Sequence, residues 1–113
     1  MIYADNAATT ALDIDAFESM KPFLLSQYGN ASQPYSFSRS ARNALKSSRE
    51  RIAKCINADP DEIYFTSGGT ESDNWALKGI VLKGDIKTII TSNIEHHAIL
   101  NTCASLEHIG ISV

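Results

Sequence analysis

Apolar side chains recur at helical spacing near the start of the chain. Over residues 14–27 they fall on one stripe, and Asp13 stands where an N-cap residue is favoured. Pro22 should bend this helix, and Gly29 with Asn30 should end it. The pattern predicts one amphipathic helix that follows a short, polar entry segment.

Residues 37–57 carry the longest helical pattern of the chain. Small and apolar side chains share one face, which should be buried. The opposite face should be solvated and carries four basic residues: Lys46, Arg49, Arg51 and Lys54. The acidic and proline residues at 59–61 should force a turn directly after this helix.

The second half alternates short apolar runs with helical patterns. Residues 62–66, 88–91 and 109–113 are typical of strands, whereas helices are expected from near Thr70 to Gly84 and over 98–107. This order predicts an α/β fold in which N-terminal helices precede a βαβαβ unit with a parallel sheet and right-handed crossovers. The first two strands should be parallel neighbours.

Composition and charge narrow the class of protein. The 113 residues are 43% hydrophobic, which suits a small globular domain. The net charge of −3, from 10 basic and 13 acidic residues with the signs interspersed, argues against a nucleic-acid partner. No apolar run has the length of a bilayer span and no signal-peptide pattern is present, so we expect a cytoplasmic protein without a membrane partner.

The cysteines and histidines do not have the spacing of a metal site. Cys55 and Cys103 form no CxxC motif, and we expect both to be buried, reduced thiols. His96, His97 and His108 lack the helical spacing or third ligand that zinc needs. The sequence therefore predicts no metal.

Residues 64–74 lead an apolar strand through two glycines into a helix, which is typical of a phosphate-binding turn. Gly68 and Gly69 let the backbone take positive φ and approach an oxygen closely, and Thr70 and Ser72 offer hydroxyl donors. The alternative is an ordinary turn capped by Ser67 or Thr70. The acidic residues Glu71 and Asp73 suit a phosphate only where their side chains turn away.

A second loop, residues 93–97, follows the next predicted strand. Because ligands gather at the carboxyl ends of parallel strands, this loop and the glycine turn should face a shared concavity. An imidazole opposite a phosphate cradle suits a planar heterocycle. At most one of His96 and His97 should face it, since adjacent side chains point in different directions, and the alternative for His96 is a loop histidine without a ligand.

Four blocks, at residues 5–10, 28–32, 66–74 and 95–98, occur in the order and approximate spacing of a known family. With them the chain resembles the N-terminal part of the cysteine desulfurases, which are pyridoxal-phosphate enzymes of fold type I in the class V aminotransferase group. The resemblance covers essentially the whole chain. It implies an extended segment, a helix and a loop over residues 1–36, followed over residues 37–113 by the first, incomplete part of a cofactor-binding α/β large domain.

The resemblance also assigns roles to residues of the blocks. Gly69 and Thr70 would bind the phosphate of pyridoxal phosphate, and His96 would stack on its ring and act as an acid or base in catalysis. The substrate side of the site would be lined by Asn6, Ala7, Ala8 and Thr9, which could equally form a simple tight turn. The chain departs from the family pattern in the loop that carries Ala31, Gln33, Tyr35 and Ser38.

The activity implied for the parent protein is conversion of L-cysteine to L-alanine, with sulfur passed as an enzyme persulfide to a sulfur-acceptor protein for iron–sulfur cluster or other pathways. A homodimer or other homo-oligomer is expected. The alternatives are another class V enzyme, such as a selenocysteine lyase or an aminotransferase, or a truncated and non-catalytic fragment. The resemblance places the cofactor-anchoring lysine and the sulfur-accepting cysteine beyond residue 113. Five lysines of this chain are expected to have no evident route to the site: Lys46, Lys54, Lys78, Lys83 and Lys87.

Overall fold

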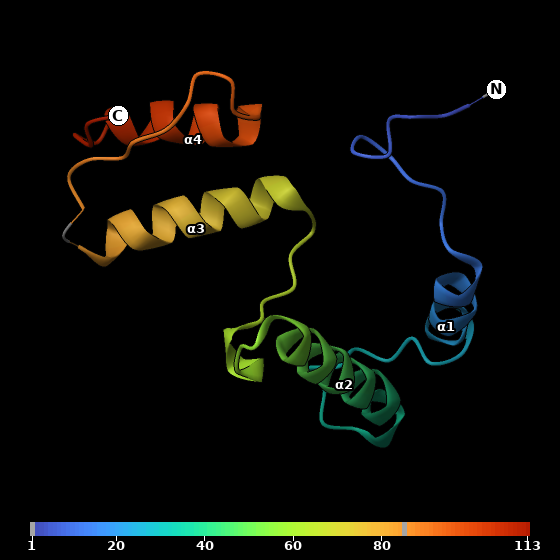
Figure 1. Cartoon of the computed structure of the whole chain (residues 1–113). Helices are drawn as coiled ribbons and strands as arrows, with labels where there is room; N and C mark the ends of the chain where they lie inside the picture. The colour runs from blue at the N-terminus through green and yellow to red at the C-terminus, as the bar shows by residue number, and fades with distance from the viewer. Residues whose placement is uncertain (1, 85) are drawn as a thin grey trace. The chain divides into compact units, whose positions relative to one another are not determined.

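The computed structural model describes residues 2–84 and 86–113 and divides the chain into two compact units that meet between Tyr64 and Phe65. The described residues form four α-helices and two short 3₁₀ helices, which Figure 1 shows along the chain. Their bounds are α1 Ile14–Leu25, η1 Ser36–Ser38, α2 Arg39–Ile56, η2 Pro60–Glu62, α3 Gly69–Lys83 and α4 His97–Glu107.

Helix α1 begins as the sequence predicts. The carboxylate of Asp13 accepts hydrogen bonds from the amides of Asp15, at 2.9 Å, and Ala16, at 3.1 Å. The helix ends at Leu25, two residues before the predicted position, and Gly29 does not terminate it. A Cβ atom at Gly29 would lie only 2.7 Å from the Phe37 carbonyl oxygen, so glycine is needed there for a close backbone approach.

Helix α2 also follows its predicted range and holds the loops beside it. Asn57 ends the helix in the left-handed conformation, at φ 54° and ψ 45°. The Arg42 guanidinium donates to the Ala31 carbonyl at 3.0 Å. Arg49 donates to the carbonyl oxygen of Ile63 in a partly buried contact, so the prediction of a fully solvated basic face is wrong at this residue.

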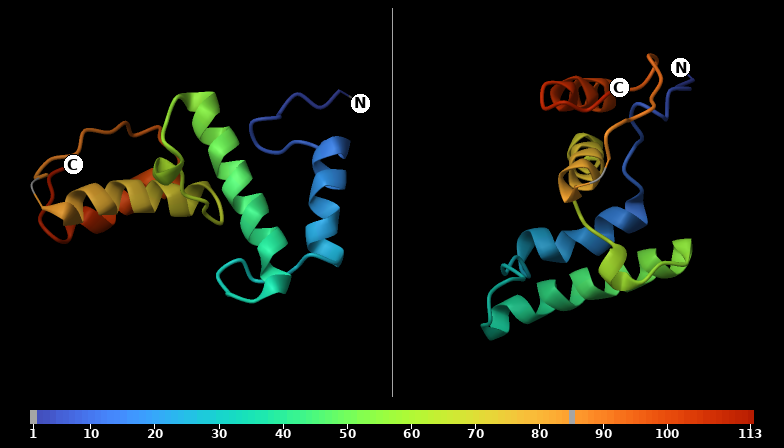
Figure 2. Two further views of the ribbon diagram at one scale, coloured as in Figure 1. Left: turned by 90° about the horizontal axis from the view of Figure 1, so that it is seen from below. Right: turned by 90° about the vertical axis from the view of Figure 1, so that its left-hand side faces the viewer.

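The apolar stripes of α1 and α2 remain largely uncovered in the first unit. The two helices run in roughly opposite directions in both views of Figure 2. Met20 of α1 is 47% exposed and Leu45 of α2 is 46% exposed. Cys55 is exposed as well, because the face of α2 on which it lies has little packed against it, and its predicted burial is wrong. None of the described helices has both the length and the apolar character needed to cross a membrane.

In the second unit α3 and α4 lie side by side with their N-terminal ends together (Figures 1 and 2). The small core of this unit contains Val81, Ala98, Thr102, Cys103 and Leu106, all of which are buried. Cys103 is therefore buried as predicted. This pairing places the two turns that enter α3 and α4 at one end of the helix pair.

The predicted βαβαβ sheet is reduced to one parallel bridge among the described residues. Thr88 pairs with Ser112, whose amide donates to the Lys87 carbonyl at 2.9 Å and whose carbonyl accepts from the Ile89 amide at 2.8 Å. No strand is formed over residues 62–66, so the pairing of the first two predicted strands stays a prediction. Two short strands alone give few hydrogen bonds and little apolar burial, which explains why the ladder is not extended.

Candidate functional site

The turn into α3 has open space in front of its glycines. Gly68 is the N-cap residue and has φ 162° and ψ −179°, which is extended backbone. Neither Gly68 nor Gly69 adopts the left-handed conformation that the sequence allows. A Cβ atom added at either glycine would meet no atom within 4 Å, so nothing in the described chain fills this space. A ligand could approach the backbone closely here.

The first turn of α3 presents unused backbone donors. The first hydrogen bond into the helix runs from the Ser72 amide to the Gly68 carbonyl, at 3.2 Å. For the amides of Gly69, Thr70 and Glu71 no acceptor lies among the described residues. Unsatisfied amides together with the helix dipole favour an anion at this end of the helix.

The acidic side chain in this turn is held away from those amides. The Glu71 carboxylate accepts from the Ser67 hydroxyl and the Ser67 amide, both at 2.6 Å. These two bonds, first the hydroxyl and then the amide, hold the pKa of Glu71 below its ordinary value of 4.5. The alternative of a helix capped by Ser67 or Thr70 is wrong, because the N-cap is Gly68 and no side chain caps the helix.

The hydroxyl of Ser72 is used within the turn. It lies 2.7 Å from the Thr66 hydroxyl and donates to the Gly68 carbonyl at 3.3 Å. The expectation that Ser72 offers a donor to a ligand is therefore not supported by its contacts. Thr70 is the hydroxyl residue of this turn that borders a pocket at the start of α3.

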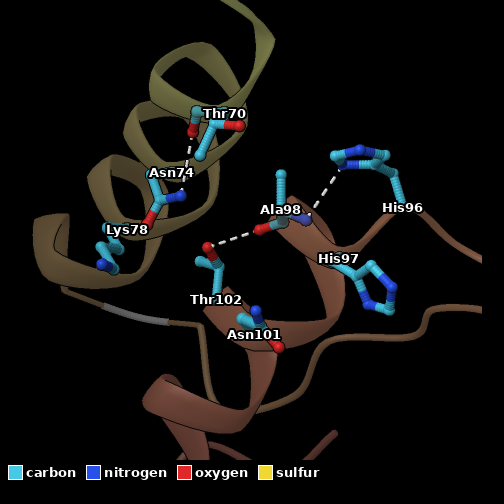
Figure 3. A pocket seen from close by; sticks show the side chains of 8 residues that line it. All are labelled: Thr70, Asn74, Lys78, His96, His97, Ala98, Asn101 and Thr102. Atoms are coloured by element: carbon cyan, nitrogen blue, oxygen red, sulfur yellow. Dashed lines mark hydrogen bonds between the residues drawn. The ribbon is translucent and has the colours of Figure 1, made fainter. Parts of the chain in front are cut away.

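One pocket of about 300 Å³ joins the starts of α3 and α4. Figure 3 shows its lining, in which Thr70 comes from α3 and His96 directly precedes α4. The prediction that Thr70 and His96 share a concavity is confirmed. Gly69 is not among the lining residues, so its predicted place at this concavity stays a prediction. The volume lies at the lower end of the range for small-molecule sites.

His96 is fixed by its own backbone contacts. It is the N-cap residue of α4, and its Nδ1 atom accepts a hydrogen bond from the Ala98 amide at 3.1 Å (Figure 3). Its carbonyl oxygen accepts from the Ile99 amide at 2.9 Å. His97 also lines the pocket, but its ring centroid lies 6.2 Å from that of His96 and the ring planes differ by 56°. Both histidines therefore border the pocket, in different orientations.

Lys78 also lines the pocket, and the sequence prediction missed it. It follows Thr70 and Asn74 at intervals of four residues, so the three side chains share one face of α3. The Asn74 amide group donates to the Thr70 carbonyl at 2.9 Å. The statement that no lysine has a route to the site is wrong for Lys78, and its helical spacing from Thr70 was the signal that could have revealed it.

The loop with the predicted substrate-side residues Asn6, Ala7, Ala8 and Thr9 belongs to the first unit. It forms a turn in which the Ala8 amide donates to the Asp5 carbonyl at 3.1 Å, and the Thr9 hydroxyl lies 2.6 Å from the hydroxyl of Tyr3. These residues are exposed. Their role at the site stays a prediction.

No group of three or more His, Cys, Asp or Glu side chains that could hold a metal ion occurs in residues 2–84 and 86–113. The polar groups that line the pocket include His96, His97, Lys78 and the side-chain amides of Asn74 and Asn101.

The family profile described as "Aminotransferase class-V" matches residues 2–113. The chain belongs to the class V aminotransferase family. It is 50% identical over 114 residues to the protein named cysteine desulfurase IscS of Dictyoglomus turgidum, with 99% of this chain and 29% of that protein covered. The protein of the same name from Methanosarcina thermophila is 47% identical over 116 residues, with 99% of this chain and 28% of that protein covered. The resemblance found in the sequence is confirmed, and the chain spans less than a third of these relatives.

Two solved structures, of a NifS-like protein and of SspA, share the fold of this chain. A NifS-like protein superposes with a TM-score of 0.87 at 39% identity, over 96% of this chain and 30% of that one. A structure described as SspA in complex with cysteine superposes with a TM-score of 0.90 at 43% identity, over 98% of this chain and 33% of that one. The fold of the chain is therefore that of part of a NifS-like protein.

Proposed function

We propose that this chain is the N-terminal part of a pyridoxal-phosphate-dependent cysteine desulfurase. The observation that carries the proposal is the pocket in which the open N-terminus of α3 meets His96. The names of the relatives and the cysteine complex of one structural neighbour support the reaction and its substrate class.

The described residues fit the phosphate of this cofactor. Unused amides at Gly69 and Thr70, without chain atoms in front of them, are suited to phosphate oxygens. The Thr70 hydroxyl adds a donor at the pocket, and the Glu71 carboxylate is held back by Ser67. When bound, pyridoxal phosphate supplies the electron sink for cleavage of the carbon–sulfur bond of L-cysteine.

In this proposal His96 lies against the cofactor ring and is the catalytic residue that this chain contributes. Its place in the wall shared with Thr70 supports that contact. Asn6, Ala7, Ala8 and Thr9 would line the substrate side. The sulfur leaves as a persulfide on an enzyme cysteine and passes to a sulfur-acceptor protein, and a homodimer or other homo-oligomer completes the assembly. A selenocysteine lyase or an aminotransferase of the same family is the second candidate, supported by the match to the class V aminotransferase family.

The first test separates phosphate recognition from ring recognition. The purified chain is titrated with pyridoxal phosphate and, in parallel, with pyridoxal, and binding is followed by the absorbance of the ligand. We expect weak binding of pyridoxal phosphate that is lost on dialysis and much weaker binding of pyridoxal. Equal affinity for the two ligands would refute the phosphate cradle.

The second test addresses the reaction. We expect no alanine from L-cysteine with the 113-residue chain and added pyridoxal phosphate, because the anchoring lysine and the sulfur-accepting cysteine are not identified in it. Alanine or sulfide above a control that contains only the cofactor would refute this expectation. Alanine and persulfide formed from L-cysteine by a longer protein that includes this chain would support the proposed activity, whereas transamination without loss of sulfur would favour the second candidate.

A further inference from the structure

A second pocket, of about 440 Å³, is lined by residues of the first unit. Its walls come from three segments that are distant in sequence: the loop at Ala31 and Ser32, helix α2, and the short helix η2 at Pro60 and Asp61. The volume is within the range of small-molecule sites. The pocket therefore has the size to hold a small ligand.

Helix α2 lines this pocket with three cationic side chains, those of Arg42, Lys46 and Arg49. Residues at intervals of four and three share one face of a helix, so the three charges follow one another along the pocket wall. Glu50 and Asp61 also line the pocket, so three positive and two negative charges give a local charge of +1. Since the whole chain has a net charge of −3, the pocket is a positive region of an acidic protein.

Arg42 holds the loop end of the pocket in place. Its Nε atom donates to the Ala31 carbonyl at 3.0 Å, and its Nη2 atom donates to the carbonyl of Gln33. The loop is a tight turn, in which the Asn30 side chain accepts from the Ser32 amide at 3.0 Å. A guanidinium has five N–H donors, and the remaining donors of Arg42 have no acceptor in the described part of the chain. A guanidinium that is already oriented loses little entropy when it binds an oxyanion.

Lys46 lies between this end and the acidic residues. Its ammonium group is 3.9 Å from the Glu50 carboxylate, and the two side chains are 76% and 51% exposed. Such an exposed pair contributes little to stability, so Lys46 can exchange Glu50 for another anion at small cost. Along α2, Arg42 is about one turn before Lys46 and Glu50 is about one turn after it. The most positive part of the pocket is therefore between Arg42 and Lys46.

We propose that this pocket binds a compact oxyanion, a phosphate or a carboxylate group, between Arg42 and Lys46. Guanidinium and ammonium groups are suited to such oxygens, and the hydroxyl of Ser32 adds a donor at the same end. Long polyanions are disfavoured, because their further charges would meet Glu50 and Asp61. The site is independent of the proposed function, which uses none of these residues.

Site-resolved NMR tests the pocket with inorganic phosphate and, in parallel, with acetate. The purified chain is labelled with ¹⁵N, and amide and arginine Nε–H signals are followed while sodium chloride keeps the ionic strength constant. We expect the signals of Ser32, Arg42 and Lys46 to shift together and to saturate with at least one of the two anions. The anion with the lower dissociation constant identifies the preferred group. Shifts confined to Gly69 and Thr70, or shifts at Ser32 and Arg42 that do not saturate, overturn the proposal.

Charge variants sharpen the test, since they leave the hydrogen bonds of Arg42 in place. Lys46→Met removes one cation and should weaken anion binding by up to about fivefold, the effect of a largely exposed charge. Glu50→Gln removes the competing carboxylate and should strengthen binding by a similar factor. Lys54→Met is the matched control, because Lys54 is in the last turn of α2 and does not line the pocket. Equal effects of Lys46→Met and Lys54→Met, or no gain in Glu50→Gln, overturn the proposal.

Discussion

Two helix N-termini border the same pocket, and only one of them is closed by its own side chain. At α3 the N-cap is Gly68, which has no side chain, and the first amides are open. At α4 the N-cap is His96, whose ring accepts the hydrogen bond of one amide. A helix N-terminus can therefore act in two ways, depending on its N-cap residue. The open N-terminus of α3 can receive an anion, whereas the capped N-terminus of α4 orients the side chain of His96.

A third helix start supports this distinction. Asp13 closes the N-terminus of α1 with two hydrogen bonds, which is the usual arrangement for a helix whose amides need no ligand. Helix α3 has an acid in its first turn too, but Glu71 reaches back to Ser67 and leaves the amides open. The difference lies in the residue at the N-cap.

The largest effect on ligand binding is expected when the open N-terminus of α3 loses one of its amide donors. Gly69→Pro removes one amide, yet proline suits the first position of a helix and the extended Gly68 suits the residue before it. A hydrogen bond to a charged group contributes about 1.5–3 kcal/mol, so pyridoxal phosphate should bind about tenfold to a hundredfold more weakly. Absorbance titration measures the affinity, and circular dichroism checks that helix content is kept.

The matched control for this change is Gly69→Ala. It keeps the amide and adds a Cβ atom that would meet no chain atom within 4 Å, so binding should change little. Equal losses for the proline and alanine variants would mean that space, and not the amide, decides affinity. Unchanged binding in the proline variant would remove the open terminus from the site.

The helices of the chain were predictable from sequence because their signals are local. Asp13, the apolar periodicity and the glycine turn place the starts of α1 and α3 within one residue of the observed ones. The ends depend more on neighbours, and α1 stops at Leu25 although the pattern continues. Sharing of the pocket by Thr70 and His96 was predicted from strands, but in the structure it arises because α3 and α4 pair with their N-terminal ends together.

The strands and the burial of particular residues were not predictable in this way. A parallel sheet depends on partners distant in sequence, and the described residues supply one bridge, between Thr88 and Ser112. Cys55 is on the apolar side of α2, but burial requires a second surface against that side. Lys78 shows the reverse, because a residue expected to have no route to the site lines the pocket that the paired helices α3 and α4 form.

The closed terminus is tested by removing its acceptor. His96→Ala leaves the Ala98 amide without its partner and should lower the free energy of unfolding by about 1 kcal/mol, the usual contribution of an N-cap side chain. His96→Asn keeps a capping acceptor and should recover most of the loss. Urea denaturation measures both variants. His97→Ala is the control, and a loss there as large as in His96→Ala would contradict the assignment of the cap.

A smaller effect on ligand binding is expected from removing the charge of Lys78, which lines the pocket. Lys78→Met removes a lysine ammonium from the lining and should weaken binding of pyridoxal phosphate by at most about fivefold, since a partly exposed charge contributes about 0.2–1 kcal/mol. Lys83→Met is the matched control, because Lys83 is in the last turn of α3 and does not line the pocket. The loss in Lys78→Met should shrink as salt is raised. Equal behaviour of the two variants would mean that Lys78 does not act on the ligand.

The smallest effect is expected on the pKa of Glu71, the acidic residue whose carboxylate is held away from the open amides of α3. The pKa of Glu71 lies below its ordinary value of 4.5, first because of the Ser67 hydroxyl and then because of the Ser67 amide. The folded state therefore binds this proton more weakly than the unfolded state. The stabilisation is complete above about pH 4.5 and is lost as the pH falls through the lower pKa of the folded protein. The carboxyl ¹³C shift of Glu71, followed against pH, measures this directly.

Ser67→Ala should raise the pKa of Glu71 part of the way to its ordinary value, because the hydroxyl bond is lost and the amide bond remains. Ser72→Ala is the control, since the Ser72 hydroxyl contacts Thr66 and Gly68. An unchanged pKa of Glu71 in Ser67→Ala would mean that the carboxylate is not held back by Ser67. The carboxylate would then be free to approach the open amides of α3. The N-terminus of α3 would no longer be available to an anion, and it would no longer differ in this way from the capped N-terminus of α4.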